Sequence, residues 1–457
     1  MVVACLNVWS HVGLGRRTHL GSLARGFARW AAGFGNGDDG RLGHGPGVGS
    51  ILKPARILLH SAMASGEINE TDEVIAVSAG GAHSALLTRE GAILSAGLND
   101  LGQLGRPKAE SVRENESNLL PVEILQASSQ SCDTMRRIEL PGRAVDVTCG
   151  HHHTLVLLES GEVIAFGSNK HGQLGVRATT DSSINMKPTK IETVKEFVSI
   201  SAGAAHSVGV SSDGTLYSWG CNRDNRLGVQ DSRSTSNLMT WLSTIMQEAS
   251  VPLPTAVHAL RGLKITAAAA GDMHTIVIDV DGKCFTFGGG RFGQLGAHTH
   301  ESKKPILLDF DHPIKQVAAG SLHSAAITTF GSLYMWGGNE SGCLGLKGNT
   351  PGQITTEPVK LEKVQDVKSV SCGWKHSAAV SADGSLYTWG WGGSVGSMQS
   401  GRDDGSGQLG HGNEFDKWEP QKVESVLTVG GRSSQIKTHA VSCGFNHTLA
   451  VMENYSS

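Results

Sequence analysis

The sequence has no long uninterrupted run of apolar residues, and no stretch approaches the roughly 20 residues that a membrane-spanning helix requires. Charge of one sign is not in excess either, because the formal net charge is −3 and the isoelectric point is near 6.7. This balance gives no general attraction to nucleic acid or to an anionic membrane, although a local basic patch remains open. We therefore expect a soluble protein without membrane insertion.

The short motifs of common enzyme classes are missing as well. There is no P-loop, no nucleophile elbow, and no pair of carboxylates whose spacing indicates acid–base chemistry. Two glycine-x-glycine-x-x-glycine patterns begin at Gly35 and Gly288, but the flanking residues predict strands and not the helix whose N-terminus binds phosphate. The histidine run at 151–153 and the eight cysteines lack metal-ligand spacing. The sequence predicts no enzyme activity, no cofactor and no metal.

One short pattern is present in several copies: a glycine, two further residues, a histidine, and then serine or threonine. It occurs seven times, and its histidines are His83, His153, His206, His274, His323, His376 and His447. A catalytic centre is not normally built seven times along one chain, whereas a structural unit is. We predict that these histidines are structural anchors, each bonded to turn backbone within its own unit.

Further markers repeat in register with the histidines. A Leu-Gly pair ends 22 residues after each of the first five, and a glycine stands eight residues after each of the first six. Contexts such as Asp-Gly at this second marker predict a hairpin turn. Each unit also has a proline three residues before an aliphatic residue, which we interpret as the start of a further strand. These prolines are Pro54, Pro121, Pro188, Pro254, Pro305, Pro358 and Pro420.

The seventh unit is divided between the two ends of the chain. No Leu-Gly pair follows His447, but residues 30–45 match the second half of a unit and end in Leu42-Gly43. A closed ring of sheets leaves fewer unpaired edges, and a sheet shared by both termini locks the ring. We predict an all-β fold over residues 27–453, namely a seven-bladed β-propeller closed by a blade split between the N- and C-termini. Residues 454–457 would form a short tail.

Three cysteines occupy one position of the repeat. Cys149, Cys372 and Cys443 directly precede the anchor glycine, where the other units have alanine. Exchange with alanine indicates a small, buried, apolar position and not a reactive thiol. Reduced cysteines agree with an intracellular compartment.

The first residues of the chain differ from the rest in composition. Residues 1–37 contain four arginines and no acidic residue before Asp38, and the stretch "HLGSLARGFARW" can form an amphipathic helix. This composition is typical of an organellar targeting leader, which we assign to residues 1–26. Mitochondria are favoured, plastids are close, and a plain N-terminal tail is the alternative.

Two segments interrupt the repeat. In residues 231–250, apolar residues at helical spacing around Trp241 predict an inserted helix that either packs on the propeller or binds a partner. After His376 the interval to the Leu-Gly glycine is 34 residues, which indicates a 12-residue insertion within residues 394–407. Loops on rigid scaffolds often carry function, and many are merely tolerated. The candidate partner contacts are Trp241, Trp374, Trp391, Arg402, Asp403 and Asp404.

The combination of the histidine motif with "DG", "YxWG" and "GQLG" around a split ring resembles the family of the regulator of chromosome condensation, over residues 30–453. The founding member is a nuclear guanine-nucleotide exchange factor for the small GTPase Ran, so the resemblance implies exchange on a Ran-like GTPase as one alternative. A plant branch is the UV-B photoreceptor, which has tryptophan in several "GWRHT" motifs. Here only Trp374 matches, so photoreception is the least favoured function. In the other six units the residues assigned as equivalent to Trp374 are Ala82, His152, Ala205, Met273, Leu322 and Asn446.

A third branch of that family is mitochondrial and combines an arginine-rich leader with a propeller that begins almost at once. This resemblance implies a non-enzymatic, monomeric scaffold in mitochondria, with the nucleus or cytoplasm as the alternative. It would support organellar RNA processing such as splicing, or the biogenesis of ribosomes or respiratory complexes, through protein or RNA contacts.

Overall fold

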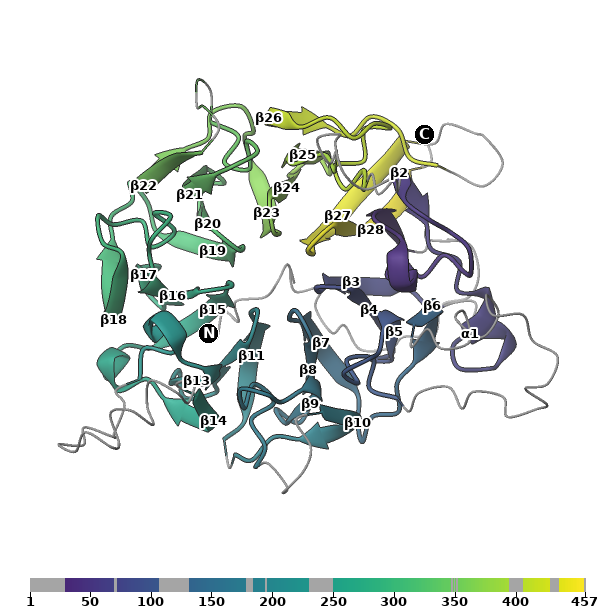
Figure 1. Cartoon of the computed structure of the whole chain (residues 1–457), viewed down its shortest axis with the longest axis horizontal. Helices are drawn as coiled ribbons and strands as arrows, with labels where there is room; N and C mark the ends of the chain where they lie inside the picture. Colours follow the sequence, from purple (N-terminus) through teal and green to yellow (C-terminus); the bar gives the residue numbers. More distant parts are fainter. Residues whose placement is uncertain are drawn as a thin grey trace, which may run out of the picture.

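The computed structural model describes residues 29–69, 72–106, 131–177, 184–193, 195–229, 250–346, 348, 350, 352–393, 406–427 and 435–455. Within these ranges the strands form seven four-stranded antiparallel sheets around a central axis (Figure 1). The predicted all-β, seven-bladed propeller is confirmed. No helix among the described residues is long and apolar enough to cross a membrane.

Six blades are continuous in sequence, and their strands follow one another from the axis outward. Blade 1 contains β3 (Val74–Ala79), β4 (His83–Thr88), β5 (Ile93–Leu98) and β6 (Ser131–Arg137). Blade 2 contains β7 (Ala144–Cys149), β8 (His153–Leu158), β9 (Val163–Ser168) and β10 (Ile184–Lys190). Blade 3 contains β11 (Phe197–Ala202), β12 (His206–Ser211), β13 (Leu216–Cys221) and β14 (Ser250–Ala256). Blade 4 contains β15 (Ile265–Ala270), β16 (His274–Asp279), β17 (Cys284–Gly289) and β18 (Glu301–Leu308). Blade 5 contains β19 (Ile314–Ala319), β20 (His323–Thr328), β21 (Leu333–Asn339) and β22 (Gln353–Lys360). Blade 6 contains β23 (Val367–Cys372), β24 (His376–Ser381), β25 (Leu386–Gly390) and β26 (Lys417–Lys422). The helical elements are short: α1 (His60–Ala64), η1 (Asp38–Gly40), η2 (Arg223–Asn225) and η3 (His258–Leu260).

Blade 7 is assembled from both ends of the chain. Its strands from the axis outward are β27 (Gln435–Cys443), β28 (His447–Tyr455), β1 (Trp30–Gly35) and β2 (Ile51–Arg56). The N- and C-terminal halves meet where β1 pairs with β28 in continuous register, from Trp30 opposite Met452 to Gly35 opposite His447. The predicted split blade is confirmed. The last strand runs two residues into the predicted tail, because Gln435 of β27 extends the pairing as far as Tyr455.

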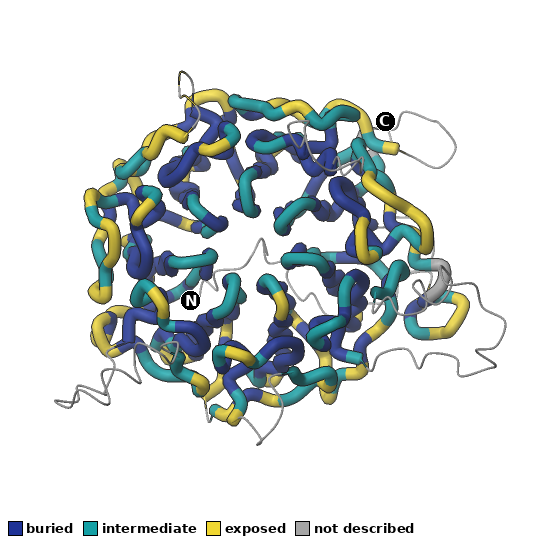
Figure 2. The backbone as a smooth tube through the Cα atoms, viewed as in Figure 1, coloured by how far each residue is buried: buried dark blue, intermediate teal, exposed yellow. Residues whose placement is uncertain are grey.

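The core lies between blades and not between layers. Every residue of β4, β8, β12, β16, β20 and β24 is buried, because both faces of these strands pack on neighbouring blades. Exposed residues gather along the outer rim (Figure 2). The hairpin that follows each of these strands turns on the predicted glycine, whose φ lies between +78° and +86°. Glycine adopts this conformation without the steric cost that other residues bear.

The repeated prolines occupy a different place from the one predicted. Where they are described, they lie inside the outermost strand of each blade and not at its start, as Pro358 does within β22. An outermost strand has one unpaired edge, so a residue without an N–H is tolerated there. Pro121 lies outside the described residues.

The outermost strand of blade 1 is the exception, because β6 contains no proline. Its free edge is covered by the chain instead. The Gly45 N–H donates to the Asp133 carbonyl at 2.8 Å, and the Glu67 carboxylate accepts a hydrogen bond from the Arg137 N–H at 2.7 Å. All seven outer edges are thus protected against pairing with another chain, six by proline and one by a cover.

Several predicted features fall outside the described residues. These are the leader at 1–26, Trp241 with most of the 231–250 segment, and Arg402, Asp403 and Asp404 of the insertion. The predicted helix is too long at its end, because Ser250 already begins strand β14. Of the insertion at 394–407, Ser406 and Gly407 are described, and the Gly407 N–H donates to the Gly392 carbonyl at 3.1 Å.

Candidate functional site at one mouth of the central channel

The seven repeated histidines form a closed ring of hydrogen bonds, which we call the anchor ring. Each begins the second strand of its blade, is fully buried, and places Nε2 within 2.8–3.1 Å of a hydroxyl in the next blade. The pairs are His83–Thr154, His153–Ser207, His206–Thr275, His274–Ser324, His323–Ser377, His376–Thr448 and His447–Ser84. The predicted bond to turn backbone within the same unit is therefore wrong. The histidine side chains join neighbouring blades.

The hydroxyl partners determine which histidine nitrogen carries the proton. Each hydroxyl donates to a backbone carbonyl, as Thr154 Oγ1 does to Gln103 at 2.9 Å, so it accepts from the histidine Nε2–H. Nδ1 then has no proton and, in all seven, no hydrogen-bond partner. Burial lowers the pKa of His83, His153, His274 and His376 to about 3 and that of His323 to about 4. Burial also takes the pKa of His206 and His447 well below the usual value. The anchor ring is neutral and structural.

The anchor glycines are required because neighbouring blades approach closely at this level. A Cβ on Gly203 would lie 2.3 Å from the Gly271 carbonyl oxygen, and one on Gly444 would lie 2.6 Å from that of Gly80. No side chain fits at such distances, whatever the backbone conformation.

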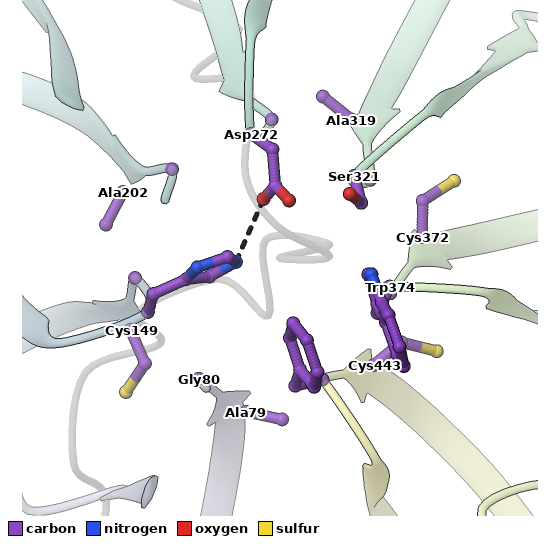
Figure 3. Close-up of a pocket in the computed structure, with 18 of the residues that line it drawn as sticks. Ala79, Gly80, Cys149, Ala202, Asp272, Ala319, Ser321, Cys372, Trp374 and Cys443 are labelled. Atoms are coloured by element: carbon purple, nitrogen blue, oxygen red, sulfur yellow. Dashed lines mark ion pairs between the residues drawn. The ribbon is translucent and has the colours of Figure 1, made fainter. Parts of the chain in front are cut away.

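The small residues that precede the anchor glycines surround the channel mouth (Figure 3). Cys149 and Cys443 are 8% and 7% exposed, close to the 7% of Ala79 at the equivalent position. Burial raises the pKa of both thiols to about 12, and burial also raises the pKa of Cys372 well above its usual value. These cysteines therefore lack the thiolate character that reactivity requires.

A second ring lies over the mouth and consists of the residue that follows each anchor glycine; we call it the mouth ring. Its members are Gly81, His151, Ala204, Asp272, Ser321, Trp374 and Phe445. Their equivalence is shown by one repeated bond to the next anchor glycine: Asp272 N donates to the Gly320 carbonyl at 3.2 Å, and Trp374 N to that of Gly444 at 3.3 Å. The residues predicted to be equivalent to Trp374, from Ala82 to Asn446, are therefore wrong by one position, because each directly follows the mouth-ring residue of its unit.

One ion pair spans the mouth between blades that are not neighbours. His151 Nε2 of blade 2 lies 2.9 Å from Asp272 Oδ1 of blade 4, past the small Ala204 of blade 3 (Figure 3). Burial opposes the charged form of His151, but the hydrogen bond and charge of Asp272 outweigh it and raise the His151 pKa. Phe445 of blade 7 packs edge to face against the His151 ring, with the two ring centroids 5.6 Å apart. Side chains thus meet across the opening.

An aromatic sector occupies the mouth at blades 6 and 7. Trp374 stacks on Phe445 with centroids 4.2 Å apart and an interplanar angle of 11°, and Trp391 stands at 90° to Trp374 at 5.5 Å. Lys375 Nζ lies 4.5 Å above the Trp374 ring and 2.8 Å from Glu340 Oε2. Trp374 and Trp391, both predicted partner contacts, are brought together here and are partly exposed.

Sequence reasoning missed the other members of this site, namely Phe445, Glu340, Lys375, His151 and Asp272. A signal for three of them was available, because the position after the anchor glycine holds a different residue in every unit. The cavity that this ring encloses measures about 80 Å³, well below the roughly 300–1,000 Å³ of small-molecule sites. Among the described residues no group of three histidine, cysteine or acidic side chains is placed to hold a metal. The geometry favours recognition at a surface.

Comparison with known proteins agrees with the fold. A family model described as an RCC1-like domain matches residues 31–450. The ultraviolet-B receptor UVR8 of Arabidopsis thaliana is 31% identical over 426 residues, covering 92% of this chain and 70% of that protein. The regulator of chromosome condensation of Xenopus laevis is 27% identical over 439 residues, covering 93% and 89%. The probable E3 ubiquitin-protein ligase HERC6 of Homo sapiens is 30% identical over 243 residues, but these are 52% of this chain and only 21% of that protein.

Two solved structures share the fold over nearly the whole chain. Prp20p of Saccharomyces cerevisiae, described with its binding to Gsp1p and histones, has a TM-score of 0.73 and 22% identity, covering 95% of this chain and 93% of Prp20p. Human WBSCR16 has a TM-score of 0.70 and 20% identity, covering 94% of this chain and 100% of that one. At these identities the likeness concerns the fold.

Proposed function

This chain belongs to the RCC1-like domain family, and on that premise we propose that it is a non-enzymatic scaffold that binds a protein partner at the mouth ring. The members of this family compared above differ in activity while sharing one propeller, so the proposal rests on the site and not on the fold.

The observation that carries the proposal is the contrast between two rings that lie one above the other. Seven blades place their equivalent positions in equivalent surroundings, so the fold makes the same demand on each. The anchor ring meets that demand with seven histidines, whereas the mouth ring has seven different residues. The fold therefore does not dictate the side chains of the mouth ring and leaves them free to form a binding surface. Partly exposed tryptophans beside charged groups are the residue types that dominate protein interfaces.

The experiment places a photo-crosslinking amino acid at one position in the full chain expressed in its own cells. At Ala204, a partly exposed member of the mouth ring just before β12, we expect crosslinking to a discrete protein. The matched control is Asp213, in the hairpin turn at the opposite end of its strand, where we expect no such product. Crosslinking only at Asp213, or at neither position, would contradict the proposal.

We further propose that the scaffold works in mitochondria, in RNA processing or in the biogenesis of ribosomes or respiratory complexes. The acid-free, arginine-bearing composition of residues 1–26 supports this location. A fluorescent reporter fused to residues 1–26 should enter mitochondria together with the tagged full chain. A diffuse reporter and a nuclear full chain would contradict it.

A second candidate is nucleotide exchange on a Ran-like GTPase. Its support is the similarity to the Xenopus laevis regulator of chromosome condensation over 93% of this chain. Purified protein that accelerates release of a fluorescent GDP analogue from Ran would establish this candidate, and an unchanged release rate would remove it. Photoreception, suggested by similarity to UVR8, predicts a change of oligomeric state after UV-B illumination, which size-exclusion chromatography detects.

A further inference from the structure

The aromatic sector of the mouth contains a binding position for a cation, and the protein's own Lys375 occupies it. One face of the Trp374 indole is covered by Phe445, stacked at 4.2 Å. The other face has the Lys375 ammonium above it at 4.5 Å. The faces of aromatic rings attract cations, and tryptophan does so most strongly.

Two further groups border this position. Trp391 stands perpendicular to Trp374 at 5.5 Å, and Glu340 contributes a carboxylate oxygen 2.8 Å from the ammonium. A second carboxylate lies on the Trp391 side, where Asp416 Oδ1 accepts a hydrogen bond from the Gly392 N–H at 2.8 Å. The ammonium thus contacts one indole and one carboxylate, and Asp416 interacts with it through charge.

The resident lysine is weakly held. The Lys375 and Glu340 side chains are 28% and 41% exposed, and ion pairs with this exposure contribute little because water and salt screen them. An ammonium is also the poorer ligand for this arrangement. A guanidinium is planar, stacks on an indole, and donates two parallel hydrogen bonds to one carboxylate.

We propose that the partner presents an arginine side chain that displaces Lys375, stacks on the outer face of Trp374 and pairs with Glu340. This inference rests on the proposed function, since it names the chemistry by which a protein would dock at the mouth. The two carboxylates decide the sign of the occupant's charge: a nucleic-acid phosphate would meet Glu340 and Asp416 and be repelled. A cationic protein segment is attracted.

The test uses the full chain labelled with 5-fluorotryptophan, whose Trp374 and Trp391 signals are assigned through Trp374→Phe and Trp391→Phe variants. Fluorine NMR then follows titration with an acetylated (Gly-Arg)4 amide peptide. We expect saturable shifts of these two signals, with affinity several-fold higher than for the (Gly-Lys)4 peptide. The (Gly-Glu)4 peptide and an eight-nucleotide oligouridylate should leave the signals unchanged.

Two variants separate specific displacement from a general change of charge. Lys375→Met should strengthen arginine-peptide binding on the order of fivefold, because the resident competitor is gone. Lys170→Met removes one positive charge at the same end of the channel and should leave the affinity within about twofold. Glu340→Gln should weaken binding at least several-fold while the spectrum stays that of folded protein.

Shifts caused equally by the lysine and arginine peptides, equal effects of the two lysine variants, or shifts caused by oligouridylate would overturn the arginine proposal. The two proposals can fail separately. A partner crosslinked at Ala204 without arginine-peptide binding leaves the proposed function standing and removes the arginine anchor. Arginine-peptide binding without any crosslinked partner removes the proposed function.

Discussion

In each unit the residue of the mouth ring and the histidine of the anchor ring have one residue between them, yet the two rings follow opposite rules. The anchor ring repeats one residue seven times, is fully buried, and bonds each blade to its neighbour. The mouth ring repeats nothing, is partly exposed at every position except the buried Ser321, and joins blades that are not neighbours through the His151–Asp272 pair. A repeat protein thus offers its own control: positions that the fold requires become uniform, and positions that the fold leaves free can differ.

Deletion of residues 441–457 should abolish the closed ring. It removes β28 and the end of β27, so β1 loses the strand with which it pairs over its whole length, and Leu449 and Val451 leave the core. We expect the cooperative thermal transition to be lost in calorimetry. Deletion of residues 456–457 alone, which leaves β28 whole, is the control. An unchanged melting transition in the long deletion would contradict the closure.

Acidification should unfold the protein through the anchor ring. The seven histidines titrate near pH 6.5 when unfolded but have lowered pKa values when folded, so below pH 6.5 the unfolded chain binds protons that the folded chain does not. Stability is therefore lost as the pH falls. At pH 5.5 each histidine favours unfolding by about 1.4 kcal/mol, and seven together by about 10 kcal/mol, which is comparable to a whole folding free energy.

Urea unfolding between pH 8 and pH 5 measures this loss. Equal stability at pH 7.5 and pH 5.5 would show that the anchor ring is not neutral in the folded state.

An added methyl group between blades should be costly. In Gly203→Ala the new Cβ meets the Gly271 carbonyl oxygen at 2.3 Å, and backbone atoms must move apart. We expect a loss of about 3 kcal/mol in the free energy of unfolding. In the matched Gly142→Ala variant the nearest atom is a Leu158 methyl carbon at 3.6 Å, so the change should stay within about 0.5 kcal/mol. Similar losses for both variants would argue against close approach as the reason for the anchor glycines.

A double-mutant cycle isolates one bond of the anchor ring. His323→Ala should destabilise the protein by about 2–4 kcal/mol, because it leaves a cavity and an unpaired buried hydroxyl. Together with Ser377→Ala, the coupling energy should be about 1 kcal/mol. Additive effects, measured by urea unfolding, would mean that the 2.8 Å contact contributes nothing to blade association.

Substitution in the mouth ring should affect stability least. His151→Ala removes a partly exposed ion pair and should cost less than about 1 kcal/mol at neutral pH. Trp374→Ala loses its stack on Phe445 and should cost about 1 kcal/mol. Both variants should nevertheless lose the protein crosslink at Ala204. If either variant loses as much free energy of unfolding as Gly203→Ala in the same urea assay, the fold requires the mouth ring as it requires the anchor ring.

The sequence predicted what depends on local repetition. The seven histidine motifs counted the blades, the Leu-Gly pair missing after His447 identified the split blade, and the glycine eight residues after each of the first six histidines located the hairpins. The partner of each histidine was not predictable, because His83 and Thr154 are 71 residues apart and meet only when blades pack. The prolines were predicted at strand starts but lie on the free edges of outermost strands. Proline is tolerated at both kinds of position, so its presence alone does not distinguish them.

The site was only partly predictable for a similar reason. Trp374 and Trp391 stood out as tryptophans near a histidine motif, but Phe445 and Glu340 belong to other blades and join them only in the ring. The one-position displacement in the equivalents of Trp374 also hid the mouth ring. When the residues are counted from the anchor glycine, the varied position is visible in the sequence itself.

The divided seventh blade also sets the order of events while the protein is being made. Gly35 leaves the ribosome 412 residues before its partner His447. At 5–20 residues per second β1 waits roughly 20–80 s for β28, the inner strand that pairs with it. During that time the apolar side chains of Trp30 and Phe34 have no blade to join. During synthesis, therefore, the inner edge of β1 stays unpaired far longer than that of any strand in the six blades that are continuous in sequence.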